Sequence, residues 1–315
     1  MKHRGTVLIA APVHPVLTEG LEAAGYSLRT AKDVTAETAP ALIADCTGIV
    51  TSLRLPLDRA LLDAAPALRW IGRMGSGMEI IDTAYAREKG IACFSSPEGN
   101  SNAVGEHALG MLLALTRRIA WSHREVQEGL WRREANRGIE LEGRTIGIIG
   151  FGHTGSAFAK KLQGFDMRIL AYDSNGTLTF PPYVEKATLA EIQQQADILS
   201  FHVPLDAGTR HYFDRSFAQA MHKPFILLNT SRGGVVALAA ALDALEAGRI
   251  RGMALDVLEQ EPPAAMTPAL RDRLLAAAAT PAVILTPHIG GYSHEALYKM
   301  SSVLLGKITA DTPDV

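Results

Sequence analysis

A glycine-rich turn between a predicted strand and a predicted helix constrains the fold of this chain more than any other feature. Residues 145–149 form a short apolar run that predicts a buried strand, and residues 156–162 favour a helix. Between them, Gly150 permits a tight turn, Gly152 leaves the backbone open to a pyrophosphate, and Gly155 allows close packing of helix on strand. The pattern predicts a dinucleotide site; the alternative is a plain strand-to-helix turn.

An acidic residue at the end of the next predicted strand favours the dinucleotide site. The apolar run 167–172 is followed by Asp173, eighteen residues after Gly155. A carboxylate at this position binds the ribose hydroxyls of a dinucleotide. The next residues, 174–176, include no Arg or Lys to meet a 2′-phosphate. The sequence therefore predicts NAD as the cofactor rather than NADP.

Length, charge and cysteine content narrow the class of protein. The 315 residues suffice for two domains, and the formal net charge of -2 gives no sign of a basic surface for nucleic acid or membrane. Cys46 and Cys93 are isolated, which favours free thiols in a reducing compartment over a disulfide or a metal site. No apolar run approaches the length of a membrane span. We expect a cytoplasmic protein without a metal.

Strand and helix patterns alternate twice along the chain. Residues 1–100 predict one doubly wound parallel sheet, and residues 145–285 predict a second. A last helix pattern, 293–308, lies beyond the second sheet and is expected to pack on the first domain. We therefore expect an α/β fold with a Rossmann cofactor domain, 102–289, inserted in a flavodoxin-like substrate-binding domain of residues 1–101 and 290–315. The strands of the second sheet are expected to end at Ile149, Tyr172, Phe201, Asn229, Leu255 and Leu285.

The segment that joins the two predicted sheets contains a polar connector, a long helix and a stretch that suits a subunit interface. Residues 95–102 are polar and predict a connector, and 103–121 predict one long, apolar helix. The following residues, 121–134, are rich in Trp, Arg and Glu, a mixture that suits a subunit interface. The alternative is a solvated helix face. We expect residues 102–143 to form a dimerisation helix and arm.

Ligands of an open parallel sheet bind beyond the carboxyl ends of its strands, so the polar residues there are the candidates for chemistry. Arg232, Glu261 and His288 each follow a predicted strand of the second sheet. An arginine grips a carboxylate with two hydrogen bonds, a histidine transfers a proton near neutral pH, and a paired carboxylate favours its protonated form. Each residue alone is equally consistent with an ordinary surface loop. The same edge also carries His202, Val203, Pro204 and Ser231, which we expect along the cofactor.

In several motifs the chain resembles the D-isomer-specific 2-hydroxyacid dehydrogenases, in their phosphoglycerate dehydrogenase-like branch. The matching runs are residues 75–77, 103–107, 141–150, 229–233, 256–262 and 286–291. The resemblance implies that Arg232, Glu261 and His288 are catalytic, and that Gly75, Ser76 and Gly77 hold the substrate carboxylate through their backbone. It implies that His153, Thr154, Asp173, Thr230, Asp256 and Gly290 line the cofactor. It further implies a homodimer and D stereochemistry.

The chain also departs from this family pattern. Residues 78–82 read Met-Glu-Ile-Ile-Asp where family members often have Val-Asp-Asn-Ile-Asp. Thr51 and Ser52 stand where phosphoglycerate enzymes commonly have Arg-Ser, although Arg54 is nearby. We expect Ser52 at the substrate and only a modest preference for a phosphorylated acid. The leading hypothesis is an NAD-dependent dehydrogenase of small 2-hydroxy acids; the alternative is a non-enzymatic NAD(H)-sensing protein of the corepressor type.

Overall fold

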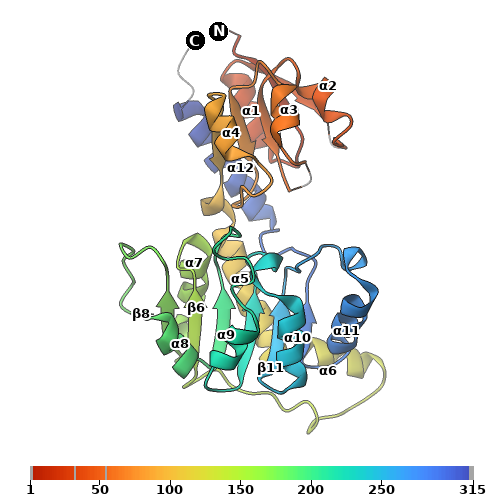
Figure 1. Cartoon of the computed structure of the whole chain (residues 1–315), viewed down its shortest axis with the longest axis vertical. Helices are drawn as coiled ribbons and strands as arrows, with labels where there is room; N and C mark the ends of the chain where they lie inside the picture. Colours follow the sequence, from red (N-terminus) through yellow and green to blue (C-terminus); the bar gives the residue numbers. More distant parts are fainter. Residues whose placement is uncertain (1–2, 32, 54, 312–315) are drawn as a thin grey trace. The chain divides into compact units, whose positions relative to one another are not determined.

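A computed structural model describes residues 3–31, 33–53 and 55–311 of the chain. The chain divides into two compact units, one of Met1–Ser101 with Gly291–Val315 and the other of Asn102–Gly290. The second unit therefore includes one residue more than the expected range 102–289. Figure 1 shows the elements of both units, coloured along the sequence.

The first unit is built on a parallel sheet, which has five strands in the described residues, in the order β2-β1-β3-β4-β5. This is the flavodoxin-like order, and the direction of winding reverses between β1 and β3. Its strands are β1 (Gly5–Ile9), β2 (Tyr26–Thr30), β3 (Cys46–Thr51), β4 (Trp70–Arg73) and β5 (Ala92–Ser95).

Helices cover both faces of this first sheet. One apolar core joins Val7, Trp70 and the helices α1 (Pro15–Ala23) and α12 (His294–Asp311). The other core lies under α2, α3 and α4. The bounds of these helices are α2 (Ala39–Ile43), α3 (Arg59–Asp63) and α4 (Thr83–Glu88). Asp82 is the N-cap of helix α4, and its carboxylate accepts a hydrogen bond from the amide of Tyr85 at 3.0 Å.

The second unit is built on a parallel sheet with seven strands among the described residues, in the order β12-β11-β10-β9-β6-β7-β8. The winding reverses between β6 and β9, as in a Rossmann fold. Its strands are β6 (Thr145–Ile149), β7 (Arg168–Tyr172), β8 (Glu185–Lys186), β9 (Ile198–Phe201), β10 (Phe225–Asn229), β11 (Ile250–Leu255) and β12 (Val283–Leu285). The predicted ends of all six expected strands are confirmed.

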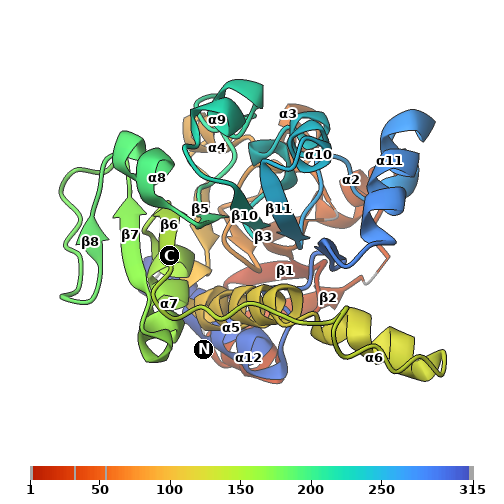
Figure 2. The same ribbon diagram turned by 90° about the horizontal axis from the view of Figure 1, so that it is seen from below.

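Two layers of helices enclose this second sheet. Figure 2 shows α5 (Pro97–Thr116) and α7 (His153–Lys161) on one face, and α8 (Leu189–Gln195), α9 (Arg215–Ala220) and α10 (Leu238–Glu246) on the other. Each face has its own apolar core. The remaining elements are α6 (Ile119–Gln127), α11 (Pro268–Ala278), and the 3₁₀ turns η1 (Leu162–Phe165), η2 (Gly233–Val235) and η3 (Pro263–Ala265).

The predicted single helix over residues 103–121 is wrong in two respects. Helix α5 already begins at Pro97, so most of the predicted polar connector is helical. The helix stops at Thr116, and Arg118 adopts a left-handed backbone with φ of 55° before α6 begins. Strands β2 and β8 and helix α2 were not predicted at all. Within the described residues, no helix combines the length and apolar character that crossing a membrane requires.

Candidate active site

The glycine loop lies between β6 and α7. Gly150 has a φ of 91°, which non-glycine residues avoid, and a side chain on Gly155 would lie 2.0 Å from the carbonyl oxygen of Gly150. A side chain on Gly152 would instead meet open space. Helix α7 begins at His153 without a hydrogen bond from a capping side chain. Its first amides, with exposed His153 and half-buried Thr154 beside them, suit the negative charge of a pyrophosphate.

Asp173 lies directly beside this loop, after β7. Its carboxylate accepts hydrogen bonds from the amides of Phe151 at 2.7 Å and Asn175 at 2.8 Å. The structure also brings a cation to this place that the sequence did not predict. The Lys186 amine lies 3.2 Å from the carbonyl oxygen of Gly176, although ten residues separate them along the chain.

Two buried polar atoms at the same edge of the sheet lack partners. Thr230, after β10, is 8% exposed, and no described residue hydrogen-bonds its hydroxyl. His202, after β9, contacts the Ser200 hydroxyl at 2.9 Å through Nε2, while no described group satisfies Nδ1. Burial lowers the pKa of His202 to about 3, so the ring is neutral. An unpaired buried hydroxyl is costly in a closed protein, and the Thr230 hydroxyl therefore fits a cofactor-lined site.

The loop that carries Arg232 is held in a fixed shape. The Asn229 side chain accepts from the Ser231 amide at 3.0 Å and donates to the Arg232 carbonyl at 2.9 Å. The guanidinium of half-buried Arg232 reaches the Ser231 carbonyl at 2.7 Å. Gly233 packs so closely on the next loop that a side chain there would lie 1.7 Å from the Leu258 carbonyl oxygen.

Glu261 and His288 form a direct pair. Glu261 follows β11, His288 follows β12, and Oε2 of the first lies 2.8 Å from Nδ1 of the second. The other Glu261 oxygen accepts from the Leu258 amide at 2.8 Å. Burial raises the pKa of Glu261, but the hydrogen bonds from His288 and Leu258 outweigh it and hold that pKa below its ordinary value. Glu261 is therefore a carboxylate near neutral pH, and Nε2 of His288 is left for proton transfer.

Asp256 supports the backbone around His288. Its carboxylate, 2% exposed, accepts from the Thr286 hydroxyl at 2.6 Å and from the amides of Ile289 at 2.9 Å and Gly290 at 2.8 Å. Its carbonyl accepts from the His288 amide at 2.8 Å. These bonds hold His288 in a left-handed backbone with φ of 55°, which costs a non-glycine residue roughly 1 kcal/mol.

His107 completes this cluster, and the sequence alone suggested no role for it. Its Nε2 lies 3.0 Å from the Thr286 hydroxyl and 3.3 Å from the Asp256 carboxylate. Burial raises the pKa of Asp256, but the hydrogen bonds from His107, Thr286, Ile289 and Gly290 outweigh burial and keep that pKa low. The signal in the sequence that could have pointed to it is a histidine, preceded by Glu106, within a mostly apolar helical stretch.

The remaining predicted cofactor residues lie at the carboxyl edge beyond β9. Val203 is half-buried, and one of its methyl groups lies 2.9 Å from where a side chain on Gly150 would be. The carbonyl of exposed Pro204 accepts from the Thr209 hydroxyl at 2.6 Å. Ser231 is 8% exposed, and its hydroxyl lies 2.7 Å from the Asn229 side-chain oxygen.

The predicted carboxylate cradle, residues 75–77, belongs to the first unit and follows β4. The Gly75 amide already donates to the Ser96 hydroxyl at 3.1 Å, so only the amides of Ser76 and Gly77 remain for a ligand. The Ser76 hydroxyl donates to the Asn100 side chain at 3.0 Å. The expectation that all three backbone amides serve the substrate is corrected accordingly.

The residues at positions 51 and 52 lie at the end of β3. Thr51 is fully buried in β3, and its hydroxyl donates to the Ser52 carbonyl at 3.3 Å, so it offers nothing to a ligand. Ser52 itself is half-buried, and Arg54 lies outside the described residues. Arg73, at the end of β4, is a buried cation, 3% exposed, that was not among the predicted site residues. Its guanidinium donates to the Met74 carbonyl, next to the cradle.

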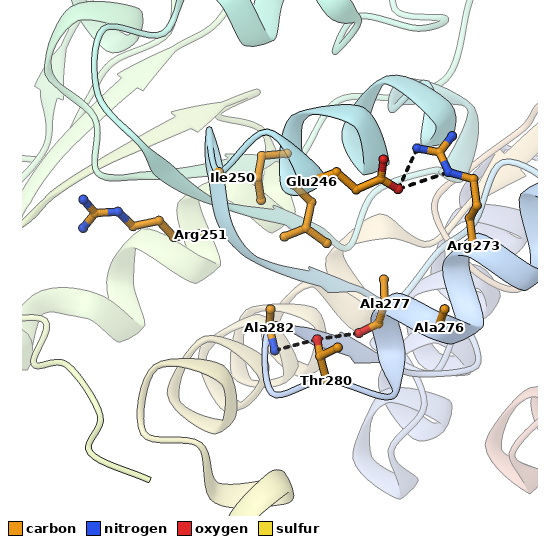
Figure 3. Close-up of a pocket in the computed structure, with 10 residues that line it drawn as sticks. Glu246, Ile250, Arg251, Arg273, Ala276, Ala277, Thr280 and Ala282 are labelled. Carbon is orange, nitrogen blue, oxygen red and sulfur yellow. Dashed lines mark hydrogen bonds and ion pairs between the residues drawn. The ribbon is translucent and has the colours of Figure 1, made fainter. Parts of the chain in front are cut away.

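A pocket in the second unit lies away from these residues. It has a volume of about 590 Å³ and lies beside the start of β11, at the amino edge of the sheet. Figure 3 shows its paired Glu246 and Arg273, joined at 2.8 Å, above alanines of α11. Because the catalytic candidates follow the carboxyl ends of the strands, this pocket is not the candidate active site.

Comparison with known proteins identifies the family. The family model described as "D-isomer specific 2-hydroxyacid dehydrogenase, NAD binding domain" matches residues 109–290. That range covers most of the second unit, including the glycine loop and the Glu261–His288 pair. The chain belongs to this family. It is an oxidoreductase of the D-2-hydroxyacid dehydrogenase type, and its second unit is an NAD-binding domain.

Individual relatives agree with this assignment. A hydroxypyruvate reductase of Thermotoga maritima is 37% identical over 248 residues, which cover 79% of this dehydrogenase and 79% of that protein. A D-3-phosphoglycerate dehydrogenase of Methanocaldococcus jannaschii is 33% identical over 96% of this chain but only 56% of its own length. The chain thus spans about half of that longer relative.

A solved structure resembles the whole dehydrogenase. The D-lactate dehydrogenase of Aquifex aeolicus, complexed with NAD and lactic acid, has a TM-score of 0.85 at 25% identity. The match covers 97% of this chain and 94% of that one. The glycine loop, the uncapped start of α7 and the buried Thr230 hydroxyl of this dehydrogenase all fit the dinucleotide of the family.

Proposed function

We propose that this dehydrogenase interconverts a small D-2-hydroxy acid and its 2-oxo acid, with NAD as the redox partner. The observation that carries the proposal is the Glu261–His288 pair, joined at 2.8 Å in the same unit as the glycine loop. A sensing protein needs the dinucleotide site but has no need of a proton donor with an anionic partner. The pair therefore favours the enzyme over the corepressor-like alternative.

Each catalytic residue has a defined task in this proposal. Bound NADH supplies the hydride that reduces C2 of the oxo acid. Protonated His288 gives its Nε2 proton to the oxygen of that carbon, and Glu261 stabilises the imidazolium and fixes the ring. Arg232 holds the substrate carboxylate with two hydrogen bonds and polarises the neighbouring carbonyl.

The first unit supplies the substrate-binding side in this proposal. The free amides of Ser76 and Gly77 receive the carboxylate, and Ser52 lies at the same edge of the sheet. The buried Thr51 supplies no cation for a distal phosphate. We therefore infer that the substrates are small 2-oxo acids of hydroxypyruvate or glyoxylate size, with at most a modest preference for a phosphorylated acid.

We also propose that two copies of the second unit form a homodimer through α6 and the arm, residues 128–140. Buried Glu125 fastens this arm to α6: its carboxylate accepts from Trp121 at 3.1 Å and from Asn136 at 2.5 Å. The hydrogen bond from Asn136, with that from Trp121, outweighs burial and lowers the pKa of Glu125. The arm is thereby held in place while Trp131 on it stays 79% exposed.

The apolar character of this surface supports a second copy as its occupant. Ile119 and Val126 of α6 are also exposed. A pocket of about 200 Å³, lined by Arg118, Trp121, Pro281 and neighbouring residues, lies beside α6. Exposed aromatic and aliphatic side chains with arginines between them are typical of protein interfaces. The two free cysteines, Cys46 and Cys93, support a cytoplasmic location.

The decisive experiment follows NADH absorbance during incubation with a panel of 2-oxo acids. We expect turnover of hydroxypyruvate and glyoxylate, and loss of at least about a thousandfold in kcat for His288→Asn. Tight NADH binding without turnover of any oxo acid would favour the sensing protein instead. Product analysis on a chiral column tests the D configuration.

A further inference from the structure

The active-site loops contain a second histidine–carboxylate pair that the proposed chemistry does not use. Glu259 precedes catalytic Glu261 by two residues, and its Oε1 lies 2.6 Å from Nε2 of His211. Its other oxygen accepts from the amide of Leu238 at 3.1 Å. Leu238 is the first residue of α10, whose start has no capping hydrogen bond from its own N-cap side chain.

Glu259 thus connects three loops that follow neighbouring strands. His211 lies on the loop after β9, Leu238 ends the loop after β10, and Glu259 itself lies on the loop after β11. The His211 amide also donates to the Gly234 carbonyl at 2.8 Å, next to the Arg232 loop. His211 adopts a left-handed backbone with φ of 51°, so the surrounding contacts define its conformation tightly.

Leu258, the neighbour of Glu259, links the catalytic residues. Its amide donates to Glu261 at 2.8 Å, and its carbonyl fills the space beside Gly233, directly after Arg232. A shift of this loop would therefore move Glu261 relative to both His288 and Arg232. Displacements well below 1 Å already matter for such catalytic geometries.

We propose that Glu259 and His211 are positioning residues for the reaction. Their pair, with the bond to the start of α10, fixes the separation between Arg232 and the Glu261–His288 pair. Glu259 does not touch the reacting atoms; it acts through Leu258 and Glu261. This inference rests on the proposed function, so turnover by the wild-type enzyme is established first.

The test compares Glu259→Ala, Glu259→Gln and His211→Ala with the wild type. We expect Glu259→Ala to lower kcat/KM for the oxo acid at least about tenfold. Because Glu261 would hold His288 less well, reduction should also fail at a lower pH. NADH affinity, measured by fluorescence, should fall less than kcat/KM, since the glycine loop and Asp173, which hold the pyrophosphate and the ribose in this proposal, lie after other strands.

The conservative variant separates positioning from charge. A glutamine at 259 can accept from the Leu238 amide and donate to His211, so Glu259→Gln should recover most of the lost activity. His211→Ala removes one partner only and should shift the activity and the pH limit in the same direction, by at least about threefold in kcat/KM. Glu185→Ala, which removes the exposed ion pair between Arg168 at the start of β7 and Glu185 in β8, is the matched control and should behave as wild type.

Several results would overturn the inference. Wild-type kcat/KM and an unchanged pH limit in Glu259→Ala would do so, as would Glu259→Gln being as defective as Glu259→Ala. If Glu259→Ala does not fold, a folded His211→Ala enzyme with wild-type kinetics would overturn it equally. Absence of turnover in the wild type would count against the proposed function and not against this pair.

Discussion

Oε2 of Glu261 and Nδ1 of His288 lie 2.8 Å apart, although 27 residues separate them along the chain. The two side chains follow adjacent parallel strands, β11 and β12, so the sheet itself brings them together. Asp256 then fixes the backbone of His288 through hydrogen bonds to that residue and the next two. The orientation of the proton donor is thereby set before substrate arrives.

The first prediction concerns this carboxylate. Glu261→Gln removes the negative charge beside His288, and a carboxylate favours the imidazolium form. Reduction requires the imidazolium, so the upper pH limit of reduction should fall by at least about one unit. The measurement is kcat/KM for the oxo acid between pH 5 and 10, and an unshifted limit would remove Glu261 from its assigned role.

The second prediction concerns the choice of cofactor. The Asp173 carboxylate repels a 2′-phosphate, so kcat/KM should be at least about tenfold higher with NADH than with NADPH. Asp173→Asn keeps a hydrogen-bond acceptor for the Phe151 amide and should reduce this preference. Lys186 places a cation beside the loop that follows Asp173. Adding Lys186→Gln to Asp173→Asn should therefore abolish any increase in kcat/KM with NADPH that Asp173→Asn produces. Equal efficiency with both cofactors in the wild type would contradict the prediction.

The third prediction concerns stability in acid. Buried His202 has a pKa of about 3 in the folded protein against an ordinary 6.5, so the unfolded chain binds a proton that the folded chain does not. Stability is therefore lost as the pH falls from about 6.5 towards 3, by about 2 kcal/mol between pH 7 and 5. In His202→Gln the melting temperature should depend less on pH over this range. The variant of an exposed histidine, His222→Gln, should keep the pH dependence of the wild type. Parallel pH curves for wild type and His202→Gln would refute it.

The fourth prediction concerns the phosphate. With Thr51 buried, kcat/KM for phosphohydroxypyruvate should exceed that for hydroxypyruvate or glyoxylate only modestly. A preference above about a thousandfold, roughly 4 kcal/mol of transition-state binding, would show the prediction to be wrong. In that case Arg54→Ala and Arg73→Lys would identify the residue that binds the phosphate.

The fifth prediction concerns assembly. Trp131→Ala removes a large exposed aromatic side chain from the arm and should weaken the dimer at least about tenfold, as measured by sedimentation. Exposed Tyr183, elsewhere on the second unit, provides the control: Tyr183→Ala should leave the dissociation constant unchanged. A monomeric wild type at micromolar concentration would contradict the proposed interface.

The repeating pattern of short apolar runs predicted both sheets and the ends of six strands, because buried parallel strands are continuously apolar and stop at polar or glycine residues. The start of α5 was missed because Pro97 and Gly99 look like loop residues. Pro97 suits the first turn of a helix. A side chain on Gly99 would lie 2.5 Å from the backbone of Met300 in α12, so this glycine serves close packing.

Among the site residues, those directly after predicted strands could be found from the sequence, and those that act through distant partners could not. His107 and Asp256 are 149 residues apart, and His211 and Glu259 are 48 apart, so local patterns carry no sign of either contact. The break at Arg118 is equally hidden, because neither glycine nor proline marks its left-handed backbone.

The discontinuity of the first unit has a consequence for synthesis on the ribosome. Strands β1 to β5 emerge first, yet Leu304 and Ile308 of α12, which complete their core, emerge only after the whole of Asn102–Gly290. During that interval α1 alone covers this apolar face of the nascent sheet, which stays partly exposed, whereas the second unit can close its own cores as soon as β12 has left the exit tunnel. The second unit would then fold before the first unit, although most of the first unit is translated earlier. The strands that are translated first are therefore the part of the nascent chain that most needs a chaperone.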